Sequence, residues 1–156
     1  MGAKVVSAFF FLSILWFPAL SLAASSSVND TSRQLYDRVM EEYKHGDYEA
    51  ALAGFRFFIE LHHRSSLAPN AQYWIGECQY RLGRYKDALN SFYNVRSYDP
   101  MSPKLAATAF KIGQTYSRLG DYEKARMMFD RVLDQYPNGD EAGLARKALT
   151  VIAPQN

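Results

Sequence analysis

The sequence predicts an all-α protein, a solenoid of three helical hairpins followed by a capping helix. A six-residue motif occurs three times without gaps, as GDYEAA, GRYKDA and GDYEKA. Two of the copies are closed by a proline, a residue that is poorly tolerated inside a helix but common just after one. An amphipathic segment, 140–152, then follows the last copy. The motif glycines, 37 residues apart, are Gly46, Gly83 and Gly120, and the two prolines are Pro100 and Pro137.

The N-terminal stretch 1–23 has the pattern of a signal peptide. Lys4 gives a positive start, and 5–17 is an apolar run too short to span a bilayer comfortably. Small side chains at Ser21 and Ala23 suit signal peptidase, so we expect cleavage after Ala23. The sequence therefore predicts an exported, periplasmic protein. The alternatives are a secreted protein or one retained by an uncleaved N-terminal anchor.

After the signal peptide, the small and polar segment 24–31 is predicted to be a flexible leader. The repeat domain is expected to span 32–153 and to include the capping helix. The predicted repeats are 32–68, 69–105 and 106–139, and the cap is 140–152. The six hairpin helices are predicted at 32–45, 48–61, 70–82, 85–97, 104–119 and 122–135.

Each motif position has a physical role. Glycine adopts the left-handed conformation that ends a helix and reverses the chain. Asp47 and Asp121 are expected to cap the helices that follow, whereas Arg84, at the equivalent position, cannot. Small alanines allow two helices to cross closely, and a phenylalanine one turn later fills the remaining space. These positions are Ala51, Ala88 and Ala125, and Phe55, Phe92 and Phe129.

Charge and composition argue against several functional classes. The 18 basic and 16 acidic residues are scattered along the chain, unlike the basic excess of a nucleic-acid-binding protein. Cys78 is the only cysteine, so we expect no internal disulfide, no lipid anchor and a buried, inert thiol. His62 and His63 are adjacent, which suits a helix end better than a metal site. No catalytic or phosphate-binding signature stands out, so we expect no enzyme, cofactor or metal.

The repeated residues resemble the tetratricopeptide repeat (TPR) family over 30–153. That resemblance implies a right-handed superhelical TPR solenoid that binds proteins. The runs 68–77 and 119–125 look like the C-terminal domain of the periplasmic Tol-Pal coordinator family, CpoB/YbgF. This implies an adaptor that binds Tol-system components and couples outer-membrane constriction to cell-wall synthesis during division. Members of that family carry a trimerisation coiled coil before the repeats, for which 24–31 leaves no room.

A second, more distant resemblance is to the BamD-like lipoproteins of outer-membrane assembly, although no lipidation cysteine follows the apolar run. The resulting expectation is a non-enzymatic adaptor that binds a protein or peptide, with a Tol-system component as one candidate partner. A BamD-like assembly component and a chaperone for exported peptides remain as alternatives.

The binding site is predicted on the concave face, which the first helix of each hairpin lines in solenoids of this type. Aromatic residues at helical spacing form a stripe along these helices, and a basic residue follows each stripe. Tyrosine suits such a face because it offers apolar area and a polar tip. For single tyrosines such as Tyr36 and Tyr73, packing against a neighbouring helix is the alternative. The candidate residues are Tyr36, Met40, Tyr43, Lys44, Tyr73, Glu77, Tyr80, Arg81, Phe110, Gln114 and Arg118; Ser117 completes the third stripe.

Overall fold

The computed structural model of the chain describes residues 19–152, with the side chains of residues 31–152. Within this part of the chain there are seven α-helices and no strands. The helices are α1 (Ala19–His45), α2 (Tyr48–His62), α3 (Ala68–Arg81), α4 (Tyr85–Tyr98), α5 (Leu105–Arg118), α6 (Tyr122–Gln135) and α7 (Asp140–Ile152). The predicted all-α solenoid of three hairpins and a capping helix is confirmed.

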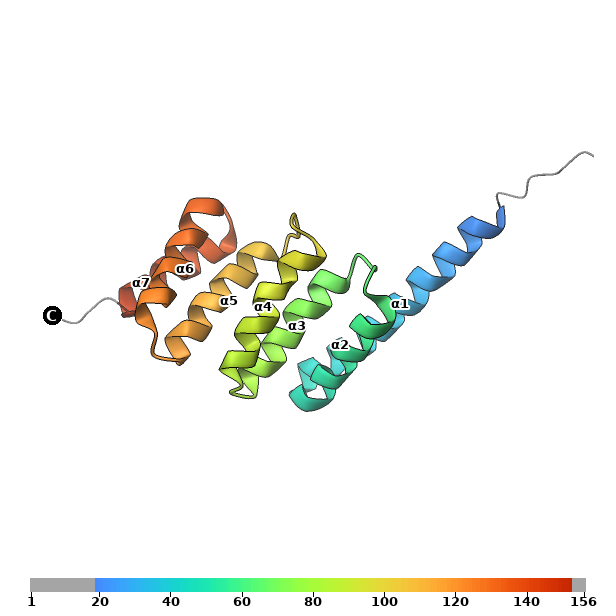
Figure 1. Cartoon of the computed structure of the whole chain (residues 1–156), viewed down its shortest axis with the longest axis horizontal. Coiled ribbons are helices and arrows are strands. Elements are labelled where there is room, and N and C mark those ends of the chain that lie inside the picture. The colour runs from blue at the N-terminus through green and yellow to red at the C-terminus, as the bar shows by residue number, and fades with distance from the viewer. Residues whose placement is uncertain (1–18, 153–156) are drawn as a thin grey trace, which may run out of the picture.

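The hairpins lie side by side in one row, from α1 and α2 at one end to α7 at the other (Figure 1). Each helix packs mainly against the helices before and after it in the chain, and α7 also contacts α5. The predicted capping role of α7 agrees with this arrangement, because Ala142 and Ala145 are buried against the last hairpin.

The turns within the hairpins follow the motif glycines. Gly46, Gly83 and Gly120 have φ angles of +87°, +74° and +78°, the left-handed region that favours glycine. Asp121 accepts a hydrogen bond from the Lys124 amide at 3.2 Å and caps α6, as predicted.

The predicted cap at Asp47 is wrong, because its side chain accepts no bond from the first turn of α2. The difference lies three residues further along each helix. The Lys124 ammonium pairs with Asp121 at 2.6 Å and holds the carboxylate over the helix end. The residue three positions after Asp47 is Ala50, which has no such group. Asp121 thus has a second contact at its helix end that Asp47 lacks.

The core is built from the repeated small and aromatic residues. The three motif alanines and the three phenylalanines that follow them are all at most 1% exposed. They form two adjoining clusters, one around α1 to α3 and one around α3 to α7. Stability thus comes from packing between neighbouring hairpins, as the single cysteine led us to expect.

The prediction of a flexible leader at 24–31 disagrees with the structure, in which α1 begins at Ala19. No glycine or proline interrupts 19–45, and alanine and leucine at its start favour a helix. The pattern that predicted a start at residue 32 marks only the part of α1 that packs against α2. The helix itself continues beyond that contact (Figure 1).

The apolar run 5–17 lies outside the described residues, and cleavage after Ala23 stays a prediction. None of the helices in the described part of the chain is long and apolar enough to cross a membrane.

Candidate functional site

Three of the predicted stripe residues belong to the core. Tyr36, Tyr73 and Phe110 are only 8%, 7% and 7% exposed. Each lies with its ring centre 5.5–5.7 Å from the phenylalanine of its own hairpin. Burial raises the pKa of Tyr36 to about 12 and raises that of Tyr73 as well. These three rings are therefore packed in the core. For Tyr36 and Tyr73 this is the packing alternative considered from the sequence.

Glu77, the second residue of its stripe, is contacted from two neighbouring helices. The Tyr43 hydroxyl, on α1, donates to Glu77 Oε2 on α3 at 3.4 Å. The Lys111 ammonium, on α5, forms an ion pair with the same oxygen at 2.9 Å. Glu77 is only 3% exposed, and its second oxygen, Oε1, is buried without a hydrogen-bond partner. A buried carboxylate thus links the first helices of all three hairpins.

Aromatic rings surround this carboxylate. Trp74 lies between Tyr43 and Tyr73, at ring-centre distances of 4.7 and 5.3 Å. Lys104 Nζ lies 5.7 Å from the centre of the Trp74 ring, and Lys111 Nζ lies 5.3 Å from that of Tyr80. Such cation–π pairs attract when the cation lies within about 6 Å of the ring.

Sequence reasoning did not select Trp74, Lys104 or Lys111. The 37-residue repeat could not find the two lysines, because Lys111 occupies the position of Trp74 in the previous copy and Lys104 that of Leu67.

The three basic residues of the predicted edge make different contacts. Lys44 pairs with Glu41 on its own helix at 2.7 Å. Arg81 lies 5.8 Å from the Tyr48 ring centre, and a hydrogen bond with the Tyr43 hydroxyl raises its pKa. Arg118 Nε donates to the Tyr80 hydroxyl at 3.1 Å.

Burial, with a smaller effect of Glu77, raises the pKa of Tyr43 to about 12, so its hydroxyl remains a donor at neutral pH. Met40 and Gln114 are half-buried beside these groups. We call the face formed by Tyr43, Trp74, Glu77, Tyr80, Lys111 and Arg118 the inner surface.

Residues that could carry other chemistry are placed as follows. Cys78 is buried, and desolvation raises the pKa of its thiol to about 12, which disfavours the reactive thiolate. His62 is the last residue of α2 and His63 follows it, as predicted. Over the side chains of residues 31–152, no group of three or more histidine, cysteine or acidic residues could hold a metal ion.

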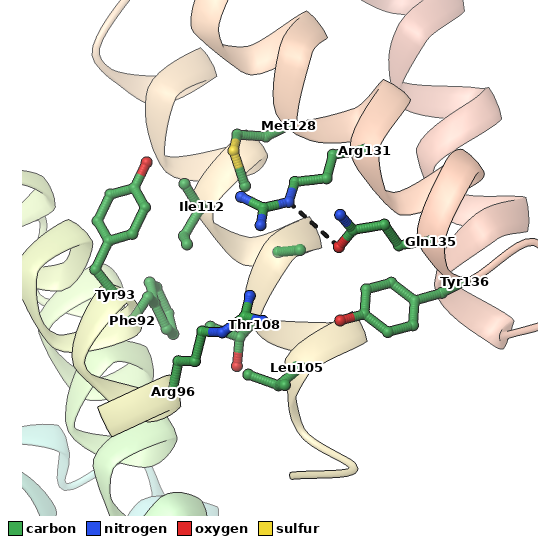
Figure 2. Close-up of a pocket in the computed structure, with 11 residues that line it drawn as sticks. Phe92, Tyr93, Arg96, Leu105, Thr108, Ile112, Met128, Arg131, Gln135 and Tyr136 are labelled. Atoms are coloured by element: carbon green, nitrogen blue, oxygen red, sulfur yellow. Dashed lines mark hydrogen bonds between the residues drawn. The ribbon is translucent and has the colours of Figure 1, made fainter. Parts of the chain in front are cut away.

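A cavity of about 100 Å³ lies on a different face, between α4, α5 and α6. Figure 2 shows Tyr93 and Arg96 from α4, Ile112 from α5, and Met128 and Arg131 from α6 around it. Sequence reasoning missed this cavity. A sequence feature that could have indicated the cavity is Ala109, a small residue that lines it. One repeat earlier the equivalent position is Gln72.

Comparison with a model of the tetratricopeptide repeat family gives a match over residues 67–138. A TPR repeat-containing protein of the archaeon Methanocaldococcus jannaschii is 34% identical over 64 residues. These make up 41% of this chain but only 11% of that relative. The match covers the second and third hairpins, and over these residues the predicted tetratricopeptide repeats are confirmed.

Solved structures share the fold. The translocator chaperone SycD of Yersinia enterocolitica aligns with a TM-score of 0.66 and 20% identity, over 79% of this chain and 89% of that one. PcrH of Pseudomonas aeruginosa aligns with a TM-score of 0.69 and 22% identity, over 79% of this chain and 92% of that one. The first TPR domain of Spaghetti (RPAP3), bound to an HSP90 peptide, aligns at 0.66 and 18% identity, over 80% and 91%. At these identities the likeness establishes the fold alone.

Proposed function

Because the chain is built of tetratricopeptide repeats, we propose that it is a non-enzymatic module that binds a protein or peptide segment on its inner surface. One observation carries the proposal: Tyr43, Glu77 and Lys111 join three helices around a carboxylate with an unused acceptor. A buried acceptor without a partner costs free energy, so stability alone does not explain why a carboxylate stands here beneath the partly exposed rings. A core built only for stability would have little reason to keep such a group.

The chemistry of the inner surface suits an extended segment with apolar and acidic side chains. Trp74, Tyr43 and Tyr80 are partly exposed rings that offer apolar area and polar tips. Arg81 and Arg118 stand at the edge of this face and are exposed, so they are available to carboxylates of a partner.

Selection from a random peptide library, followed by fluorescence anisotropy with the selected peptides, tests this proposal. A Tyr80→Ala/Arg118→Ala chain should bind about tenfold or more weakly, as for the loss of hot-spot residues. Tyr93→Ala, which changes the opposite face, should bind normally. Circular dichroism checks that both variants remain helical. Equal binding by wild type and the Tyr80→Ala/Arg118→Ala chain would overturn the proposal.

A chaperone role is the second candidate, and a specific observation favours it. SycD has been solved with a peptide of the translocator YopD, and PcrH with the chaperone binding region of PopD. Capture of partners from an extract of the source cells separates the two roles. One constant envelope partner supports an adaptor, whereas many unfolded exported proteins support a chaperone.

For the cellular setting we propose the periplasm and a Tol-system component as the partner, with a BamD-like assembly role as the alternative. The support is the sequence alone: the signal-peptide pattern of 1–23 and the runs 68–77 and 119–125. N-terminal sequencing of the exported protein should find Ala24 as the first residue. Crosslinking in intact cells should join it to a Tol-system protein, and crosslinks only to outer-membrane assembly proteins would favour the alternative.

A further inference from the structure

The cavity between α4, α5 and α6 lies outside the inner surface and has no role in the proposed function. We propose that it is a second binding site, which takes an aliphatic side chain from an acidic segment of a partner protein. The argument rests on its shape, its lining and its two arginines, and we call the site the outer cavity.

The outer cavity lies where the two repeats carry different side chains at equivalent positions, and Ala109 in place of Gln72 is one of these differences. One repeat earlier, Gln72 occupies the corresponding space, is buried, and donates through Nε2 to the Ser91 carbonyl at 3.0 Å. At the equivalent position Ala109 leaves the space open. The volume of about 100 Å³ would hold roughly three waters at about 30 Å³ each, and it equally suits one aliphatic side chain.

Part of the lining is apolar and can contact an apolar side chain. Leu105, Ile112 and Met128 are among the residues around the space (Figure 2), and Ala109 adds another apolar surface. Against these residues a leucine or methionine side chain would gain dispersion contacts, while Thr108 and the arginines of the same lining remain available to polar groups of the segment.

Two arginines add a preference for negative charge. Arg96 on α4 and Arg131 on α6 both line the outer cavity. Neither forms an ion pair with any of the side chains that the structure describes. Arg131 Nε donates to Gln135 Oε1 at 3.3 Å, which directs its guanidinium across the space (Figure 2). Two cations without carboxylate partners beside an apolar hollow complement an acidic segment that carries an aliphatic side chain.

The test uses a labelled peptide of alternating glutamate and leucine, and the same peptide with glutamine in place of glutamate. Fluorescence anisotropy with the full chain measures binding. Wild type should bind the glutamate peptide, and the glutamine peptide should bind about tenfold more weakly. No binding of the glutamate peptide below about 1 mM would overturn the proposal.

Two variants then locate the site. Ala109→Gln fills the outer cavity with the side chain that the previous repeat already accommodates, so the fold is expected to remain. Arg96→Gln/Arg131→Gln removes the charge and leaves the hollow. Each should weaken the glutamate peptide about tenfold, and unchanged binding by Ala109→Gln would overturn the proposal.

The inner-surface variant Tyr80→Ala/Arg118→Ala separates this site from the proposed function. Because the inner surface is also proposed to take acidic segments, this variant isolates the binding that remains at the outer cavity. Ala109→Gln added to it should weaken that remaining binding about tenfold, and complete loss of binding in the Tyr80→Ala/Arg118→Ala chain would assign the peptide to the inner surface and overturn the outer site. NMR of the Met128 methyl group gives a second readout, because a side chain in the outer cavity shifts its signal. Sedimentation of the free chain addresses another occupant: a dimer that Ala109→Gln dissociates would show that a second copy fills the cavity and would overturn the proposal.

Discussion

Two equivalent spaces between successive hairpins are packed differently. The first lies between α2 and α4 above α3, and the second between α4 and α6 above α5. The helices that frame them repeat with the same 37-residue offset, since α3 and α5, like α4 and α6, begin and end at equivalent residues. Yet Gln72 is buried in the first space and hydrogen-bonded to the backbone there, whereas the second holds a cavity beside Ala109. In a repeat protein, equivalent backbone intervals can therefore be packed differently by the side chains that line them.

Phe92→Ala should have the largest effect, because this ring serves both intervals. It is 1% exposed, packs against Tyr73 in the first interval and lines the outer cavity of the second. We expect the free energy of unfolding in urea to fall by about 3–5 kcal/mol. The matched control is Phe57→Ala, a ring that is 51% exposed on α2. Equal losses for the two variants would contradict this packing.

Gly76→Ala and Gly113→Ala should have the next largest effects on stability. They test whether Phe92, which lines the outer cavity, moves more easily than Phe129. An added Cβ would lie 2.6 Å from Phe92 at Gly76 and 2.6 Å from Phe129 at Gly113. Such overpacking costs about 1–3 kcal/mol. Phe92 can move toward the cavity, so Gly76→Ala should lose less stability than Gly113→Ala.

Thermal and urea unfolding measure the difference between these two glycines. The control is Gly143→Ala, where an added Cβ meets nothing within 4 Å, and where alanine should raise stability by up to about 1 kcal/mol through its helix propensity. If Gly76→Ala proves the more costly change, Phe92 does not relax into the outer cavity.

Gln72→Ala should open a space in the first interval at the position that Ala109 occupies in the second. It removes a buried hydrogen bond of 3.0 Å and leaves a space behind, so we expect a loss of about 1–2 kcal/mol. The reciprocal Ala109→Gln should change stability by less than about 1 kcal/mol, because it can donate to the equivalent carbonyl of Met128. Urea unfolding of both variants gives the comparison. A neutral Gln72→Ala would mean that filling the interval is not what stabilises it.

Arg84→Ala should have the smallest effect. Arg84, in the second repeat, forms an ion pair with Glu49 of the first repeat at 2.6 Å, and both side chains are largely exposed. One repeat later, Lys86 stands at the position of Glu49 and Asp121 at that of Arg84, so the charges are reversed. Asp121 pairs with Lys124 rather than with Lys86. We expect a loss of about 0.2–1 kcal/mol at low salt, and the loss should shrink in 1 M salt. A loss that does not depend on salt would show that the Arg84 stem matters through packing.

Local rules predicted the helices well. The structure places α6 and α7 at the predicted residues, and the other hairpin helices differ by at most two residues at an end, apart from the start of α1. The exceptions depend on more than one residue. Asp47 has the side chain of a cap but lacks the neighbouring ammonium that holds Asp121 in place. Segment 24–31 looks like a leader by composition, yet it continues the helix that follows.

The candidate site was predicted only in part. Helical spacing placed Tyr43, Glu77 and Tyr80 on one side of their helices, and the structure brings them together around one carboxylate. The same spacing could not show which of the stripe residues are buried: Tyr36, Tyr73 and Glu77 are buried, whereas Tyr43 and Tyr80 are partly exposed. Whether a residue of a stripe is exposed depends on how the next hairpin packs against its helix. The spacing of residues within one helix does not contain that information.

By itself, the sequence determined the repeat length, the left-handed glycine turns and the buried alanines and phenylalanines, because each follows from backbone preference or from side-chain size at a fixed position. Only the tertiary structure decided that Lys104 and Lys111 reach rings on α3, and that Ala109 opens a cavity where Gln72 fills one. These features arise between side chains of different helices. Their geometry exists only once the hairpins have stacked.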